Sequence, residues 1–437
     1  MVLAGLALDG GLYVPESWPT LGAGPSASYV DTAHRVIAPF VGADIDDAVL
    51  RGLLADSYSA FRHPDVVPIV GLEDGHFLME LFHGPTLAFK DVALQLLGRL
   101  FDHILTARDE RVTIVGATSG DTGSAAIDGV KDCSRVDIVI LYPKGRVSEV
   151  QRRQMTTVDS PNVRTVAVDG TFDDCQDLVK AMFNHSEFRE QQRLSAVNSI
   201  NWARVMAQVV YHVQAARSFD GPFDVSVPTG NFGNVLSGWI ARRMGAPIRR
   251  LVVASNQNDI LTRFFESRTM SATGVHPTLS PSMDIQVSSN FERLLFEMNG
   301  RDGSATAGQL ERFRASGSLA VDDATFEHWI APTFRAGRAS DHDTLATMRQ
   351  VFESTGMQID PHTAVGVKAA REHMEEGVPM LTLATAHPAK FPDAVERATG
   401  LRPDLPEHLS DLLDRPERTV DLPNDLAAVE DFVASGR

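Results

Sequence analysis

The sequence of 437 residues has 40 basic and 57 acidic side chains, a formal net charge of −17 and 43% hydrophobic residues. These values are typical of a globular protein with two or three domains, and they exclude wholesale disorder and fibrous repeats. The negative charge argues against nucleic acid or an anionic membrane as the main partner, and two cysteines exclude a disulfide scaffold. Since no apolar run approaches the roughly 20 residues that span a bilayer and no secretory signal precedes Asp9, we expect a cytoplasmic protein.

In chain order, helical periodicity comes first, over residues 33–51 and 48–61. From residue 66, short β-branched runs alternate with turns and helix-like stretches, a pattern that predicts parallel α/β sheets covered on both faces. The expected strands are 66–70, 77–82, 112–115, 136–141, 163–168, 225–227, 251–254 and 379–384. The expected helices include 91–104, 124–130, 149–156, 174–184, 203–218, 235–244 and 363–374.

Three segments differ in amino-acid composition from this alternating pattern. Residues 298–308 and 335–343 are rich in Gly, Ser, Ala and Asp and are expected to form surface loops or insertions. The tail over 401–437 has nine acids, four bases and four prolines, so we expect short solvated helices on the surface. We find no HExxH, CxxC or GxSxG motif, so the sequence supports neither a metal site nor a hydrolase nucleophile elbow.

The first chemical motif is His-Gly-Pro-Thr-Leu-Ala-Phe-Lys-Asp over residues 83–91. An apolar strand ends in Gly-Pro, and a helix is expected from about Ala88. Lys90 therefore lies near a helix N-terminus with apolar neighbours, which favours its neutral, nucleophilic form. The alternative is an ordinary surface lysine whose stem covers apolar surface.

Two loops rich in small residues each follow a strand and open a helix, over residues 116–124 and 228–234. Backbone amides at a helix start, with hydroxyls beside them, form a cradle for a carboxylate or a phosphate. The second loop is neither GxGxxG nor a Walker loop, which favours a phosphorylated cofactor over a nucleotide. At Gly233 the missing Cβ would allow close approach to a phosphate, with a positive φ if required. The alternative for both loops is a capped turn.

A basic turn over residues 142–148 contains Lys144, Arg146 and Ser148, groups that suit an anionic leaving group. The alternative is a solvated turn. Segments 198–204, 360–366 and 384–391 carry amide, hydroxyl, imidazole and cationic side chains, which either cap helices or line a cleft.

Together with segments 9–15 and 282–290, these motifs resemble the threonine synthase family, pyridoxal phosphate (PLP) enzymes of fold type II. The resemblance runs from about Gly5 to Lys390. Relatives usually have a further strand and part of a helix before the segment at Gly5, so the family's N-terminal domain is expected to be incomplete here.

The resemblance implies a tryptophan-synthase-β-like α/β fold in three parts. These are a mainly helical N-terminal domain (1–64), a large PLP-binding domain (65–105 and 200–437) and a small domain with a substrate loop (106–199). The implied reaction converts O-phospho-L-homoserine and water to L-threonine and phosphate. A monomer or homodimer in the cytoplasm is expected.

The resemblance also assigns residues. Lys90 would bond covalently to the cofactor and shuttle protons, and Thr385 would face the pyridine nitrogen. Asp121, where many fold type II relatives have Asn, would lie near the cofactor's 3′-oxygen. The phosphate would be held by Gly230, Asn231, Phe232, Gly233 and Asn234. The expected substrate-binding residues are Thr118, Ser119, Thr122, Lys144, Arg146, Ser148, Asn198 and Arg204. Two alternatives remain: a PLP phospho-lyase that releases a 2-oxo acid, and a non-catalytic pseudoenzyme.

Overall fold

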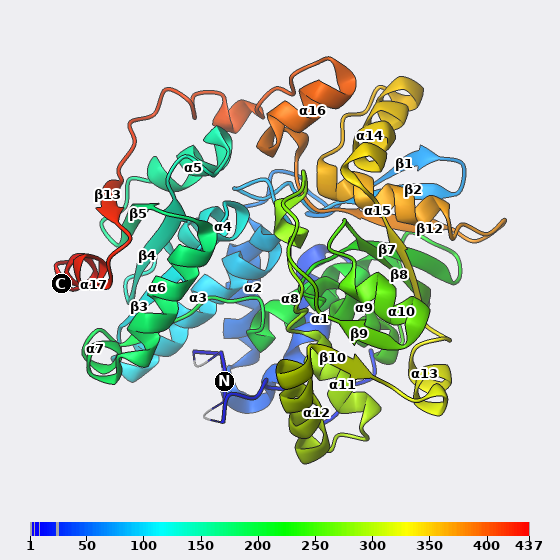
Figure 1. The fold of residues 1–437 in the computed structure, drawn as a ribbon, viewed down its shortest axis with the longest axis horizontal. Coiled ribbons are helices and arrows are strands. Elements are labelled where there is room, and N and C mark those ends of the chain that lie inside the picture. Colours follow the sequence, from blue (N-terminus) through cyan, green and yellow to red (C-terminus); the bar gives the residue numbers. More distant parts are fainter. Residues whose placement is uncertain (1, 4, 8, 23–25, 437) are drawn as a thin grey trace.

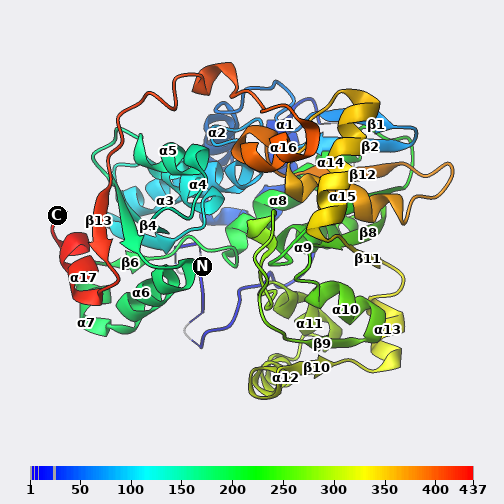
Figure 2. The same cartoon turned by 45° about the horizontal axis from the view of Figure 1, so that its top comes forward.

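The computed structural model describes residues 2–3, 5–7, 9–22 and 26–436. Two sheets lie side by side in it, each covered by helices (Figure 1). The turned view in Figure 2 separates the small sheet, with α6 and α17 beside it, from the large sheet, with α14 and α15 beside it. This arrangement confirms the predicted α/β class with parallel sheets.

The large sheet has six strands in the order β1-β2-β12-β7-β8-β11. Its β1–β2 pair is an antiparallel hairpin, and the remaining pairs are parallel. The central strand β7 is buried at every position, as expected for a strand covered on both faces. The bounds are β1 (Ile69–Glu73), β2 (His76–Glu80), β7 (Phe223–Pro228), β8 (Ile248–Ser255), β11 (Phe334–Arg338) and β12 (Met380–Ala384).

The small sheet has five parallel strands in the order β13-β5-β4-β3-β6. Ile138 and Ile140 of β4 face the main core, whereas Val139 and Leu141 face a second core under α6 and α17. The bounds are β3 (Val112–Ala117), β4 (Val136–Pro143), β5 (Val163–Asp169), β6 (Leu194–Ser195) and β13 (Val420–Pro423). A third, two-stranded sheet pairs β9 (Thr269–Ser271) with β10 (Ser318–Ala320).

The N-terminal helices α1 (Tyr29–Val41) and α2 (Asp47–Tyr58) pack on α8 and α3 respectively. A capping box between Ser28 and Asp31 starts α1. The other helices are α3 (Lys90–Arg108), α4 (Asp121–Val130), α5 (Glu149–Thr156), α6 (Phe172–Asn184), α7 (Ser186–Gln191), α8 (Trp202–Ala215), α9 (Gly233–Arg243), α10 (Ile260–Ser267), α11 (Phe291–Met298), α12 (Gly303–Ser316), α13 (Asp323–Trp329), α14 (Asp341–Thr355), α15 (Pro361–Arg371), α16 (Pro392–Thr399) and α17 (Leu426–Ala434).

Several expected elements were wrong or shifted. The helix expected over 33–51 is divided, because α1 ends at Val41 and α2 begins at Asp47. The segment 335–343 is not a loop, because residues up to Arg338 form the edge strand β11 beside β8. The first strand begins at Ile69, since Val66 has a left-handed φ of 63° that ends the extended run. The segment 298–308 includes the first turns of α12, and helix α3 begins at Lys90.

The tail over residues 401–437 was expected to form surface helices, but part of it pairs with the small sheet and is buried. Strand β13 pairs with β5, and α17 buries Val429 and Val433 in the second core. Residues 420–434 therefore complete the small sheet, whereas the sequence placed 200–437 with the large domain. The physical reason is that β13 covers the edge of β5 and α17 covers the outer face, which would otherwise expose apolar surface. The expected domain boundaries stay a prediction.

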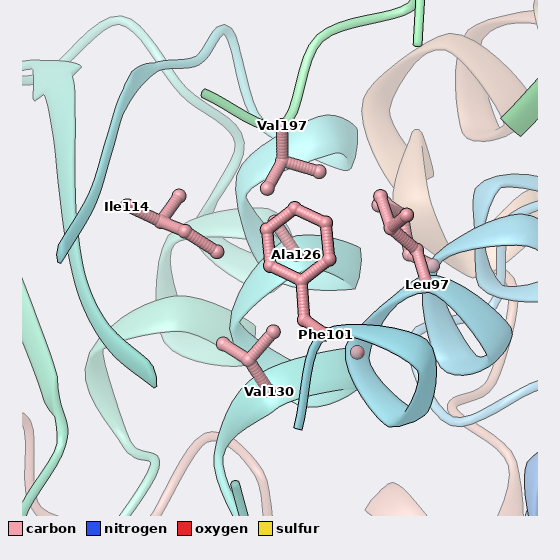
Figure 3. A pocket seen from close by; sticks show the side chains of 8 residues that line it. Leu97, Phe101, Ile114, Ala126, Val130 and Val197 are labelled. Carbon is pink, nitrogen blue, oxygen red and sulfur yellow. The ribbon is translucent and has the colours of Figure 1, made fainter. Parts of the chain in front are cut away.

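Helices α3 and α4 cross at two glycines. A Cβ added to Gly98 would lie 1.9 Å from the carbonyl oxygen of Gly129, so the two backbones touch. Figure 3 shows the apolar side chains around this crossing, with Phe101 of α3 among Ala126 and Val130 of α4 and Val197. The crossing joins the helix that carries Lys90 to the helix that carries Asp121, and thereby sets the spacing of these two residues.

Candidate active site

A cleft of about 790 Å³ opens where the carboxyl ends of strands from both sheets meet. Loops that follow β3, β7 and β12 line the cleft, as is general for ligand sites in open α/β sheets, and the segment 275–289 adds a further part of the lining. Of the residues expected from the sequence, the following line the cleft: Lys90, Ser119, Thr122, Arg146, Arg204, Gly230, Asn231, Gly233, Asn234 and Thr385.

A tight turn before α3 positions Lys90. The carboxylate of Asp91 folds back and accepts hydrogen bonds from the Thr86 amide (2.8 Å) and the Thr86 hydroxyl (2.6 Å). A Cβ at Gly84 would lie 2.5 Å from Asp91 Oδ2, so the turn needs a glycine there. Burial raises the pKa of Asp91 to about 7. The turn therefore fixes the start of α3 and the direction of Lys90.

Lys90 is buried at the base of the cleft. Its Nζ lies 3.3 Å from Asp121 Oδ2 and 5.0 Å from the centroid of the Phe89 ring. Burial lowers the pKa of Lys90, and Asp121 opposes that effect. The nearby cations Lys390 and Arg204 lower this pKa further. The environment thus favours a neutral amine, as the sequence predicts for a nucleophilic lysine.

Asp121, the first residue of α4, lies behind Lys90 in a dense polar network. Its Oδ1 accepts a hydrogen bond from Gln151 Nε2 (2.9 Å) and lies 3.1 Å from Lys390 Nζ. Its Oδ2 also accepts from the Ser282 hydroxyl (3.3 Å). Burial alone would raise the pKa of this carboxyl, but Lys390 and Lys90 hold it well below the usual range. Asp121 is therefore an ionised carboxylate.

The loop after β7 forms the expected cradle at the start of α9. The first turn of a helix leaves its amides without intrahelical acceptors, and here that turn lines the cleft. The left-handed conformation falls on Phe232 (φ 62°) rather than on Gly233. A Cβ at Gly233 would lie 3.2 Å from Asn290 Nδ2, so its close neighbour is another loop.

Asn234 continues this cradle and carries a polar atom that needs a partner. Its side-chain oxygen accepts a hydrogen bond from the Tyr211 hydroxyl (2.7 Å). Its Nδ2 is buried and has no hydrogen-bond partner among the described residues. An anionic oxygen in the cleft would satisfy this donor.

The side chain of Thr118 stabilises the loop after β3 through hydrogen bonds within the loop. The Thr118 hydroxyl accepts hydrogen bonds from the amides of Gly120 (3.0 Å) and Gly123 (2.9 Å). Gly120 has φ 137°, which a side chain rarely adopts. Thr118 is thus a structural residue of the loop that presents Ser119 and Thr122 to the cleft.

Arg204 of α8 brings a buried positive charge to the cleft wall. Only 4% of the residue is exposed, and its Nε and Nη1 have no hydrogen-bond partner among the described residues. Burial lowers the pKa of Arg204 to about 10. Because an unpaired buried charge is costly, this guanidinium fits an anionic ligand.

The remaining expected residues lie elsewhere. Lys144 is 56% exposed and pairs with Asp421 at 2.6 Å, outside the cleft lining. The Ser148 hydroxyl caps α5 and donates to the carbonyl oxygen of Lys390 (3.1 Å). Asn198 is outside the lining, and its Oδ1 is buried without a partner among the described residues.

Sequence reasoning missed several residues that contact the site. Lys390, Gln151 and Ser282 all reach Asp121, although they belong to three separate segments. His362 lines the cleft, its Nδ1 lies 2.7 Å from Asp360 Oδ2, and its Nε2 accepts from the Ser282 amide (3.3 Å). The sequence signals were that segments 360–366 and 384–391 are polar turns after apolar runs, and that segment 282–290 contributes to the family resemblance.

The site fits a phosphorylated aldehyde cofactor. Lys90 supplies an amine that burial favours in its nucleophilic form, and the first turn of α9 supplies amides for a phosphate. The buried donors of Asn234 and Arg204 call for anionic oxygens. Within the described residues, we find no cluster of three or more metal-ligating side chains and no helix long and apolar enough to cross a membrane.

Family models cover most of the chain. A model for pyridoxal-phosphate dependent enzymes matches residues 62–385. Models for the threonine synthase N terminus and the threonine synthase C-terminal region match residues 1–58 and 363–433.

Individual relatives agree with these matches. A threonine synthase from Pseudomonas aeruginosa is 53% identical, over 99% of this chain and 94% of the relative. One from Corynebacterium glutamicum is 43% identical, with coverage of 99% and 94%. Among solved structures, the PLP-bound threonine synthase from Brucella melitensis has a TM-score of 0.97 at 50% identity, covering 100% of this chain and 95% of that one. The yeast threonine synthase has a TM-score of 0.93 at 39% identity, with coverage of 99% and 94%. The chain therefore belongs to the threonine synthase family of PLP-dependent lyases of fold type II, which confirms the fold class, activity and cofactor that its sequence predicts.

Proposed function

We propose that the cleft converts O-phospho-L-homoserine and water to L-threonine and phosphate, with Lys90 as the catalytic lysine. The observation that carries the substrate assignment is the guanidinium of Arg204, which lines the same cleft as Lys90 and has no partner at Nε or Nη1 among the described residues. A protein with a net charge of −17 repels a phosphorylated substrate at long range, so buried local cations must supply the attraction.

Each loop of the cleft has a proposed task. Gly230, Asn231, Phe232, Gly233 and Asn234 hold the cofactor phosphate at the start of α9, and the Thr385 hydroxyl faces the pyridine nitrogen. Ser119 and Thr122 bind the substrate carboxylate, while Arg204 and Arg146 bind the substrate phosphate. The structure gives no comparable support to Lys144, Ser148 or Asn198, which stay predictions.

The chemistry divides between the cofactor and the chain. When bound, PLP supplies an electron sink that delocalises negative charge developed on the substrate carbons. Lys90 Nζ removes the proton at Cα and returns protons to the substrate, a task that needs an amine whose pKa is below its ordinary value. The walls of the cleft orient the Cγ–phosphate bond and hold the phosphate that leaves.

The experiment is a product assay on the purified, PLP-loaded protein with O-phospho-L-homoserine. We expect equal amounts of L-threonine and inorganic phosphate, with Lys90→Ala as the inactive control. Formation of 2-oxobutyrate with phosphate would instead establish the phospho-lyase alternative. Absence of phosphate release, with full cofactor occupancy confirmed by absorbance, would contradict both activities.

A cytoplasmic location and a monomeric or homodimeric state are also proposed. Cys133 and Cys175 are both free thiols, which suits a reducing compartment. Cell fractionation checks the location, and light scattering of the eluted protein measures its mass in solution.

A further inference from the structure

Two buried lysines share one carboxylate beside the cleft. Lys90 Nζ lies 3.3 Å from Asp121 Oδ2, and Lys390 Nζ lies 3.1 Å from Asp121 Oδ1. The sequence contains six lysines, so a third of them meet at this carboxylate. Only one of the two can be the nucleophile, and the family assignment does not explain the presence of the other.

Lys390 is held by three polar contacts. Its Nζ donates to the Thr86 carbonyl oxygen (2.6 Å) and to Gln154 Oε1 (2.8 Å), and it forms an ion pair with Asp121 Oδ1 at 3.1 Å. The residue is 0% exposed and lies in the short 3-10 helix Pro388–Lys390. Two oxygen acceptors and a carboxylate at 3.1 Å surround this buried amine, a setting that suits an ammonium because the carboxylate is its counter-ion.

Lys90 has a different environment. Its Nζ has one protein acceptor among the described residues, Asp121, and its side chain reaches the cleft, where water can take a proton. The charged groups that face Lys90 are Asp121 from α4, Lys390 from the 3-10 helix and Arg204 from α8. Those that face Asp121 are the two lysines and, from α15, His362.

The net charge of the two lysines and Asp121 then distinguishes the roles of the two lysines. With both protonated, the two lysines and Asp121 carry a net charge of +1 inside the protein. Loss of the proton from Lys90 to cleft water leaves the neutral pair of Lys390 and Asp121, which a buried site prefers. Without Lys390, the neutral state would instead be the pair of Lys90 and Asp121, in which Lys90 keeps its proton.

We propose that Lys390 is a positioning residue: it holds a permanent positive charge on Asp121 and thereby leaves Lys90 as the lysine that gives up its proton. Gln151, which donates to the same oxygen of Asp121, fixes the orientation of the carboxylate. The inference rests on the proposed role of Lys90 as the cofactor lysine.

The test is competitive labelling of the full-length, cofactor-free protein with acetic anhydride over a range of pH, read by peptide mass spectrometry. Exposed Lys180 is the internal reference. Lys390→Met should raise the midpoint of Lys90 labelling by at least about one pH unit, which lowers its rate near neutral pH about tenfold. Asp121→Asn should lower the same midpoint. The control Lys368→Met, at an exposed pair with Glu372, should leave it unchanged.

Opposite shifts in the two variants would support the proposal, because a merely structural lysine would not produce them. An unchanged Lys90 midpoint in folded Lys390→Met would overturn it. If circular dichroism shows that Lys390→Met does not fold, Lys390→Gln, which keeps a polar side chain without the charge, decides: a raised Lys90 midpoint supports the proposal and an unchanged one overturns it. Borohydride reduction of the PLP-loaded protein followed by peptide mapping tests the role of Lys90 separately, so the two ideas can fail independently.

Discussion

Two buried arginines near the cleft are expected to respond in opposite ways to the same substitution. Arg204 lacks partners at Nε and Nη1, whereas Arg293 donates to the carbonyl oxygens of Tyr13 (2.9 Å) and Ile200 (2.7 Å) and to Asn290 Oδ1 (2.6 Å). Burial lowers the pKa of both groups to about 10. The hydrogen-bond partners, rather than the depth of burial, distinguish the two residues.

The magnitude follows from the pKa and the missing partners. A fall from 12.5 to about 10 corresponds to roughly 3 kcal/mol against the charged form of Arg204 in the folded protein. Because the folded-state pKa is depressed, this penalty applies in full at neutral pH. Arg204→Met removes it and is expected to stabilise the cofactor-free protein by about 1–3 kcal/mol. Arg293→Met leaves three acceptors unpaired and is expected to destabilise by about 2 kcal/mol or more.

Activity should move in the reverse direction for Arg204. Loss of a charge-assisted hydrogen bond to the substrate phosphate costs about 1.5–3 kcal/mol, or roughly 10- to 150-fold in kcat/KM. The assays are phosphate release under steady-state conditions, PLP absorbance for occupancy, and the apparent melting temperature without cofactor. A kcat/KM within about twofold of the parent, together with a lower melting temperature, would refute the assignment of Arg204 as an anion site.

Other parts of the site give sharper single tests. Lys90→Ala should abolish turnover while the protein folds and binds PLP without a covalent bond, so borohydride should fix no cofactor; near-native turnover would contradict the catalytic assignment. Arg146→Ala should lower kcat/KM about tenfold or more because this side chain lines the cleft, whereas exposed Lys144→Ala should stay within about twofold; equal losses would return Lys144 to the substrate site. Gly98→Ala should lower the melting temperature, since its Cβ would lie 1.9 Å from the backbone of α4, while Gly52→Ala, in an open exposed position of α2, should stabilise by about 0.4–1 kcal/mol. Equal effects of the two glycine substitutions would mean that the helix crossing can relax.

The residues that the sequence predicts for the site and that line the cleft come from local motifs. The turn before α3 and the loops before α4 and α9 each lie within about ten residues, and their strand, small residues and helix start are all visible in one stretch. Lys90 can therefore be proposed as the cofactor lysine from its immediate neighbours. The predicted loops also place Ser119, Thr122 and Asn234 at the cleft.

The elements that were missed have weak local signals. Strand β11 contains Arg335, Gly337 and Arg338 in five residues, so it does not resemble the apolar runs of the central strands. Strand β13 lies in an acidic, proline-rich tail, with Val420 41% exposed. Both are edge strands, which need hydrogen bonds on one side only and so tolerate polar residues.

The network around Asp121 depends on contacts between segments that are far apart in the chain. The carboxylate begins α4, one cation begins α3, and the other, Lys390, follows β12. Local sequence shows an aspartate where many fold type II relatives have asparagine, but not the lysine that compensates its charge.

Because Asp121 and Lys390 neutralise each other's charge, we expect the stability effects of substitutions at the two positions to be coupled. An asparagine at 121 would leave Lys390 as a buried cation with no counter-ion, which costs several kcal/mol unless the lysine is also replaced. Relatives with a neutral residue at the position of Asp121 should therefore have a neutral residue at the position of Lys390. In this chain, Asp121→Asn/Lys390→Met should be more stable than the sum of the two single substitutions, by about 1–3 kcal/mol in a double-mutant cycle. If the stability effects of the two single substitutions are additive, the two side chains do not stabilise each other, although Lys390 Nζ lies 3.1 Å from Asp121 Oδ1.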